Sequence, residues 1–273
     1  MSDGATADGE ARRDAASAQQ RVGVDPPESA IFLAWPTPAL ERRAAARGTT
    51  VEALARTATS GDTACGPPPY TALRGARVPD ELCAALRGAL EATLWPAAAQ
   101  RSGVETQHYL VLRRHGNEPY EALKAACESV MAWADPTFPY DHLAITSNFV
   151  ASPHVDMRDV SFQYAMALGD FEGGGELCVE AADGRTRWCV ETRGRLARFD
   201  GRAVHWVRSY TGQRWSVVWY VNREESATPQ TFDVDAAWRP AGDIVADANK
   251  QRNGDRGSGG GGVADHPDAP CVS

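Results

Sequence analysis

The sequence has no run of about eighteen apolar residues, the length that a membrane-spanning helix needs. Its first 27 residues contain no apolar segment typical of a secretory signal. They also contain several acidic residues, whereas organelle transit peptides have few. No two of the six cysteines have CxxC spacing, so neither a zinc ribbon nor a thioredoxin-like motif is indicated. We therefore expect an intracellular protein, in the cytoplasm or nucleus, with reduced cysteines and no membrane partner.

Lysine is also scarce, because only two of the 28 basic residues are lysines. The two ends, residues 1–30 and 223–273, hold −7 of the formal net charge of −8, which leaves the middle almost neutral. A stretch from 185 to 208 has seven arginines and two acids, and it could contact phosphates. Solvated strand faces are the favoured interpretation, so a nucleic-acid partner stays among the candidates without support from charge.

The chain is 273 residues long and 43% hydrophobic, which is enough for a sizeable core. Residues 1–30 are rich in Ala, Gly, Asp and Ser without periodicity, and we expect a disordered N-terminal tail. A single catalytic domain is predicted over residues 31–222, with its core at about 140–222. Residues 223–273, which include a glycine run, are predicted to be a flexible C-terminal tail.

Helical spacing of apolar residues comes first along the chain, at 50–58, 79–94 and 118–134. Short segments rich in β-branched and aromatic residues follow, separated by turn signals such as Asp-Gly. The expected strands are 105–113, 143–148, 161–168, 176–180, 186–191, 196–199, 203–207 and 214–221. A helical first half followed by many short strands predicts an α+β domain built on a sandwich or small barrel.

The segment Pro153-His154-Val155-Asp156 is the most informative. In an extended strand, His154 and Asp156 point to the same side and form a two-toothed ligand. His205 stands 49 residues after Asp156 within an apolar strand of its own. Two histidines and one carboxylate are the facial triad of non-haem Fe(II) oxygenases, which leaves coordination positions open. Zinc is the competing metal, although its catalytic sites more often use three histidines or HExxH.

Arg214 and Ser216 follow nine and eleven residues after His205, and the period-two rule places them on one strand face. The guanidinium fork donates two parallel hydrogen bonds to a carboxylate, and a serine hydroxyl adds a third donor. We expect this pair to hold the far carboxylate of a 2-oxo dicarboxylic acid whose keto-acid end chelates the iron.

The motifs His154-Val155-Asp156, His205 and Arg214-Trp215-Ser216, in this order and spacing, resemble the Fe(II)/2-oxoglutarate-dependent dioxygenase superfamily. The resemblance covers about residues 140–222, and 161–177 is similar to the branch of methylcytosine-oxidising enzymes and uncharacterised algal members. It implies a double-stranded β-helix, or jelly-roll, core with supporting N-terminal helices. It also implies Fe(II), 2-oxoglutarate and O₂ as reactants, and succinate and CO₂ as products.

By this resemblance, the chain oxidises a C–H bond of a nucleobase, a protein side chain or a small metabolite. His154, Asp156 and His205 would hold the iron, and Arg214 with Ser216 would hold 2-oxoglutarate. Two alternatives stay open. One is a non-catalytic β-helix binding module, and the other is a cupin-type metalloenzyme that uses no keto acid.

Three further residues are candidates by position. Asn148, six residues before His154, could hydrogen-bond the co-substrate, and Tyr164 on the next strand could reach it. Arg158, two residues after Asp156, would lie at the mouth of the site and meet the primary substrate. Cys178 and Cys189 are predicted to be small buried hydrophobes.

Overall fold

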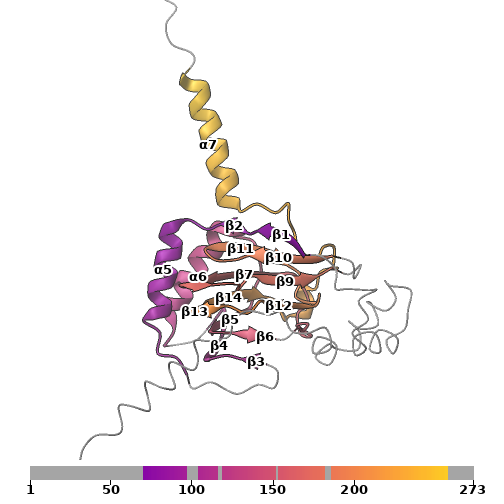
Figure 1. Ribbon diagram of the computed structural model, residues 1–273. Helices are drawn as coiled ribbons and strands as arrows, with labels where there is room; N and C mark the ends of the chain where they lie inside the picture. Colours follow the sequence, from indigo (N-terminus) through magenta and orange to yellow (C-terminus); the bar gives the residue numbers. More distant parts are fainter. Residues whose placement is uncertain (1–69, 97–103, 116–118, 152, 182–185, 258–273) are drawn as a thin grey trace, which may run out of the picture.

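Short strands, most of them in the second half of the chain, pair into two main sheets (Figure 1). The computed structural model describes residues 70–96, 104–115, 119–151, 153–181 and 186–257. The predicted helix at 50–58 and the predicted tail at 1–30 lie outside these residues.

The larger sheet has six strands in the order β2-β11-β7-β14-β5-β4. These strands are β2 (Ala76–Arg77), β11 (Arg195–Phe199), β7 (Gln163–Leu168), β14 (Trp215–Tyr220), β5 (His142–Ser147) and β4 (His108–Arg113). Their pairings are all antiparallel. Strands that are distant in the sequence, such as β2 and β11, are therefore neighbours in the sheet.

The smaller sheet has the order β1-β10-β9-β12. Its strands are β1 (Tyr70–Arg74), β10 (Arg187–Glu191), β9 (Leu177–Glu180) and β12 (His205–Val207). Two short pairs complete the set: β3 (Val104–Glu105) with β6 (Val150–Ala151), and β8 (Phe171–Glu172) with β13 (Thr211–Gly212). β1, which pairs in parallel with β10, was not predicted from the sequence.

Helices α5 (Asp80–Glu91) and α6 (Glu121–Ala134) pack together on one side of the six-stranded sheet (Figure 1). The core between helices and sheet takes alternate residues of β7 and β14, among them Tyr164, Met166, Val217 and Trp219. The remaining residues of these strands face the smaller sheet, where a second apolar cluster lies. This α+β arrangement of two facing sheets, whose strand pairs are antiparallel except β1–β10, has the form of a double-stranded β-helix, as predicted.

The predicted flexible tail at 223–273 is wrong over its first part. After a short 3₁₀ turn, η2 (Glu224–Ser226), the chain returns to the domain. There Val234 forms a β-bridge with Phe199, and the ring of Trp238 lies tilted against that of Tyr164, with centroids 5.0 Å apart. The glycine run and polar end of this segment suggested a tail, but Val234 and Trp238 in its first part pack against the core of the domain. The domain therefore continues past residue 222.

A last helix, α7 (Ala241–Gly257), begins beside α6 and extends away from the sheets (Figure 1). Its start is tightly packed, because a Cβ on Gly242 would lie 2.1 Å from the Trp133 ring. Among the described residues, no helix is long and apolar enough to cross a membrane.

Candidate metal centre

Two strands that are distant in the sequence bring the predicted metal ligands together. His154 and His205 form an antiparallel bridge in which each backbone N–H donates to the other's carbonyl, at 3.0 and 2.8 Å. The backbone of the second ligand is also held in place, because the N–H of Asp156 donates to the carbonyl of Gly201 at 2.9 Å. Val155, between the two ligands, packs against Cys178, Val204 and Trp206, as the period-two prediction requires.

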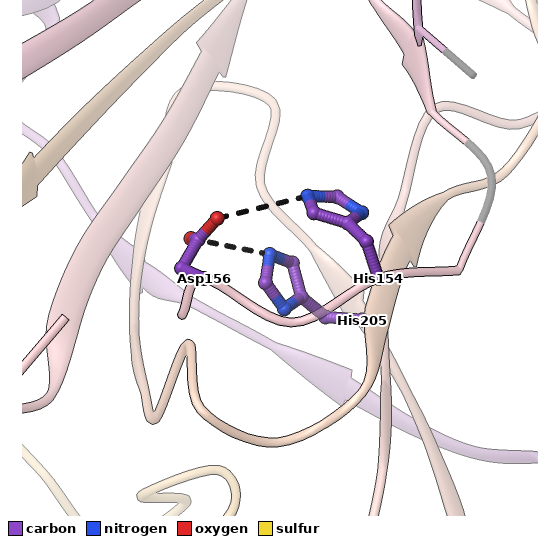
Figure 2. Close-up of side chains that lie close together, drawn as sticks. All are labelled: His154, Asp156 and His205. Atoms are coloured by element: carbon purple, nitrogen blue, oxygen red, sulfur yellow. Dashed lines mark ion pairs between the residues drawn. The ribbon is translucent and has the colours of Figure 1, made fainter. Parts of the chain in front are cut away.

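The three side chains converge on one point (Figure 2). Their candidate ligand atoms all lie within 4.8 Å of one another. His154 Nε2 lies 3.8 Å from Asp156 Oδ1, and His205 Nε2 lies 3.5 Å from Asp156 Oδ2. Two imidazole nitrogens and a carboxylate oxygen at this spacing fit a single divalent transition metal.

The protonation of His205 also suits a metal ligand. Its burial, followed by the nearby His154, lowers the pKa of His205 to about 4. The imidazole is therefore neutral at neutral pH, as coordination requires. Its Nδ1 lies 3.0 Å from the carbonyl of Ala203, and donation from Nδ1 leaves the Nε2 lone pair facing Asp156.

Gln163 is a site residue that sequence reasoning missed. It is the first residue of β7, its side chain is 1% exposed, and its Nε2 donates to Asp156 Oδ2 at 3.0 Å. The signal was present in the sequence, because Gln163 is the polar residue among Gln163, Ala165 and Ala167 on one face of an otherwise apolar strand.

Arg214 and Ser216 lie as predicted on one face of the sheet and contact each other. The guanidinium is 3% exposed, its Nη1 donates to Ser216 Oγ, and its Nε donates to the Gly175 carbonyl at 3.1 Å. Phe171 and Tyr210 flank it, with ring centroids 5.4 and 5.5 Å from Cζ. Among the described residues, no carboxylate lies within ion-pair distance of Arg214.

The charge of Arg214 is therefore buried with no direct ion pair in the described part of the chain, and Glu176 acts on it only through a longer-range electrostatic attraction. Burial lowers the pKa of Arg214 to about 10, so the group stays protonated at neutral pH. A buried cation without a partner is costly, and an anionic ligand would offset that cost. Two of its five N–H donors have protein acceptors, which leaves donors for a carboxylate.

One cavity of about 770 Å³ between the two sheets contains both the triad and the Arg214–Ser216 pair. Thr146 and Thr192 also line it, and each has a buried hydroxyl without a hydrogen-bond partner in the described structure. Orphaned hydroxyls beside an unpaired guanidinium are the surroundings that a polar anionic ligand would satisfy. The donor set of the triad thus fits Fe(II), and the surroundings of Arg214 fit an anionic ligand.

The structure places Asn148 in a turn beside Arg214, away from the cavity lining where a co-substrate was expected to reach it. Its side chain does not line the cavity, and its Nδ2 donates to Gln107 Oε1 at 2.8 Å and Gln213 Oε1 at 3.2 Å. Its Oδ1 accepts the backbone N–H of Arg214 at 2.9 Å, and its φ is +52°. Asn tolerates this left-handed conformation, so Asn148 shapes the turn that leads β5 away from β14.

The structure also places Tyr164 away from the cavity lining. It lies on the helix side of β7, is 0% exposed, and its hydroxyl donates to Asp135 Oδ2 at 2.8 Å. Burial and the neighbouring carboxylate raise the pKa of Tyr164. Adjacent strand residues point to opposite faces, so Gln163 and not Tyr164 reaches the cavity.

Arg158 and Met157 line the cavity and are exposed, Met157 at 84%, so they mark where it opens to solvent. The role of Arg158 toward a substrate stays a prediction. The arginines between 187 and 208 are mostly engaged within the protein. Ion pairs join Arg187, Arg195, Arg198, Arg202 and Arg208 to Glu180, Glu191, Asp235, Asp200 and Glu176, respectively.

No protein-family model matches the sequence, and no curated protein matches it. The solved structures that it matches include NgTET1 in complex with 5mC DNA, at 21% identity over 50% of this chain and 47% of that chain, with a TM-score of 0.28. This chain thus spans about half the length of the NgTET1 chain.

Two bacterial structures also match. One is a 2OG-Fe(II) oxygenase-family oxidoreductase from Burkholderia pseudomallei, at 18% identity over 52% of this chain and 80% of that chain, with a TM-score of 0.37. The other is a prolyl-4-hydroxylase from Pseudomonas putida, at 20% identity over 52% of this chain and 85% of that chain, with a TM-score of 0.34. These superpositions are partial, so fold and site rest on the strand order and the geometry above. The chain has an α+β fold that resembles the double-stranded β-helix of 2OG-Fe(II) oxygenases, and it carries a candidate His–Asp–His triad between its sheets.

Proposed function

We propose that this protein is an Fe(II)- and 2-oxoglutarate-dependent oxygenase that oxidises a C–H bond of a substrate entering beside Arg158. One observation carries the proposal: the unpaired, buried guanidinium of Arg214 lies in the same cavity as the His154–Asp156–His205 triad. A metal site alone would not need a buried cation nearby. A metal that binds a keto acid with a second carboxylate would need one.

When bound, Fe(II) and 2-oxoglutarate would supply the activation of O₂ and the two-electron oxidation that releases succinate and CO₂. The contribution of the chain is to bind and orient. His154, Asp156 and His205 hold the metal on one face, and Arg214 with Ser216 orients the far carboxylate by charge-assisted hydrogen bonds.

Part of the remaining cavity wall is apolar. Leu177, Phe199, Ala165 and Val218 line it from both sheets and offer no hydrogen-bonding side chains. An apolar lining strengthens the electrostatic interactions inside and limits unproductive reaction with solvent.

The test is an anaerobic titration with Fe(II) and 2-oxoglutarate, followed by the weak visible charge-transfer band of the chelated complex. We expect the band in the wild type and not in His154→Ala. Its absence from folded wild-type protein would favour the binding module or the cupin-type enzyme.

Two further measurements separate those alternatives. A non-catalytic module would release no succinate, whereas an oxygenase releases it slowly even without a prime substrate. A cupin-type enzyme uses no keto acid, so Arg214→Ala would not make its activity depend on a higher keto-acid concentration. Arg214→Ala in the proposed enzyme needs a much higher 2-oxoglutarate concentration.

A further inference from the structure

Gln163 acts on one of the two oxygens of the candidate metal ligand Asp156. Its Nε2 donates to Oδ2 at 3.0 Å, and this oxygen also lies 3.5 Å from His205 Nε2. The other oxygen, Oδ1, faces His154 Nε2 at 3.8 Å and accepts no hydrogen bond from Gln163. The amide therefore distinguishes two oxygens that are chemically equivalent in a free carboxylate.

Gly201 makes the space that the amide occupies. A Cβ on Gly201 would lie 1.9 Å from Gln163 Nε2 and 3.2 Å from Asp156 Oδ2. The carbonyl of the same residue accepts the backbone N–H of Asp156 at 2.9 Å. One glycine thus fixes the ligand's backbone and leaves room for the group that fixes its side chain.

A role in stability alone does not account for Gln163. Its Oε1 is buried and has no hydrogen-bond partner in the described structure. An unsatisfied buried carbonyl costs about 1–3 kcal/mol, so an apolar residue would suit this position at least as well for packing. The group that the amide does satisfy is the carboxylate of the triad.

We propose that Gln163 is a positioning residue that holds Asp156 Oδ2 and so presents Oδ1 to the metal. Binding through one oxygen occupies one coordination position and leaves others open for the co-substrate. The proposal rests on the metal site of the proposed function, and it does not depend on which substrate is oxidised.

The test compares Mn(II) binding to wild type, Gln163→Met and Tyr164→Phe by the loss of the free Mn(II) electron paramagnetic resonance signal. Gln163→Met keeps the volume and removes the donor, and we expect Mn(II) affinity to fall about 10- to 100-fold. Tyr164→Phe is the matched control, because it removes a hydrogen bond to Asp135 from the opposite face of β7. It should lower the thermal midpoint and leave Mn(II) affinity unchanged.

The outcomes separate the two proposals. A wild type that binds no Mn(II) overturns the metal site and the proposed function with it. Wild-type affinity in folded Gln163→Met overturns only the role of Gln163. If that variant does not fold, Gly201→Ala displaces the amide without removing it, and unchanged Mn(II) affinity there would likewise overturn the role.

An independent feature concerns Cys178 on β9 and Cys189 on β10, which face each other in the ladder. The N–H of Ala181 donates to Thr186 on the β10 side, whereas the N–H of Glu180 donates to Val204 on the β12 side. Because these directions alternate, Cys178 and Cys189 form a pair without mutual backbone hydrogen bonds. Cα atoms in such pairs lie about 4.5 Å apart, within the range that a disulfide spans.

Cys189 is the accessible member of the pair. It lines a separate cavity of about 520 Å³, while Cys178 is fully buried. The contact with Cys178 and the nearby Arg208 lower the pKa of Cys189, which favours the reactive thiolate. A small oxidant can therefore reach one sulfur whose partner is already in place.

We infer that a peroxide converts Cys178 and Cys189 into an intramolecular disulfide. The two thiols lose their hydrogens and form the S–S bond, while the O–O bond of the peroxide breaks and, with hydrogen peroxide, gives two waters. The inference does not depend on the proposed function.

The full chain, treated with hydrogen peroxide, is unfolded, alkylated and digested without reductant. We expect a linked peptide pair two hydrogens lighter than the two free peptides, and we expect it before Cys83 is modified. Cys83 is the internal comparison, because burial raises its pKa. Oxidation of Cys83 while Cys178 and Cys189 are still alkylated would overturn the inference.

Discussion

His154 and His205 hydrogen-bond each other's backbones in both directions, at 3.0 and 2.8 Å. The two imidazoles therefore meet because their strands pair, and the metal is not needed to bring the strands together. His154→Ala should keep the metal-free fold within about 0.5 kcal/mol, the usual range for a partly exposed substitution. The same variant should lose most of its Mn(II) affinity. A matched pair of thermal melts and Mn(II) titrations checks both statements, and a metal-free variant that unfolds would contradict the first.

The buried carboxyl of Asp159 should make metal-free stability depend on pH. Burial, followed by the nearby Asp156 and Asp200, raises the pKa of Asp159 to about 9. The folded state then binds this proton up to about pH 9, whereas the unfolded chain releases it near pH 4. Stability from this group is thus present at low pH and is lost as pH rises through that window.

Asp159→Asn isolates this effect, because the opposing titration of His205 is nearly the same in both proteins. The variant should match the wild type near pH 4. As pH rises above 4, the free energy of unfolding of the variant should exceed that of the wild type by up to about 1.4 kcal/mol more per pH unit. The difference should stop growing above pH 9. Denaturant unfolding of both metal-free proteins from pH 4 to 9 measures the difference. A difference that does not change with pH would show that Asp159 ionises normally in the fold.

Asn148 should act through backbone conformation. Its φ of +52° costs an alanine about 1–2 kcal/mol and costs glycine nothing in sterics. Both substitutions lose the same amide hydrogen bonds. Asn148→Ala should therefore be less stable than Asn148→Gly by about 1 kcal/mol, or about 2–4 °C in thermal midpoint for a domain of this size. Equal midpoints would mean that the turn relaxes.

The pairs His154–Asp156 and Arg214–Ser216 could be predicted from the sequence, because the members of each pair are two residues apart in extended chain. The third ligand, His205, was predicted from its distance along the chain and the resemblance to a known family. The period of two predicts which residues share one face of a strand, but it does not predict which face lines the cavity. Gln163 and Tyr164 show the consequence: the phenol was the more suggestive side chain, yet Tyr164 faces the helices. Only the packing of β7 against α6 and the smaller sheet decides between them.

The other features of the fold could not be predicted, because they depend on pairing between strands that are distant in the sequence. β1 completes the smaller sheet by pairing in parallel with β10, and no local pattern near Tyr70 predicts that partner. Val234 and Trp238 lie in a polar segment whose composition indicates a tail. Their burial comes from Phe199 and Tyr164, which are neighbours only after the strands have paired.

The two members of the carboxylate site should differ in how much 2-oxoglutarate binding they contribute. With Mn(II) bound, saturating 2-oxoglutarate should raise the thermal midpoint, because a ligand at 100 times its Kd stabilises the fold by about 2.7 kcal/mol. Ser216→Ala removes one donor and should raise the Kd about tenfold, which is about 1.4 kcal/mol. Arg214→Lys keeps the charge and loses the guanidinium fork, so its Kd should rise further.

The test measures the thermal midpoint against 2-oxoglutarate concentration in wild type, Ser216→Ala and Arg214→Lys. The Kd values should rise in that order. Succinate, which keeps the far carboxylate but has a plain carboxylate in place of the keto-acid end, is the comparison ligand. If Arg214 holds the far carboxylate, Arg214→Lys should weaken both ligands by a similar factor. Loss of 2-oxoglutarate binding with unchanged succinate binding would place Arg214 at the keto-acid end, because only that end differs between the two molecules.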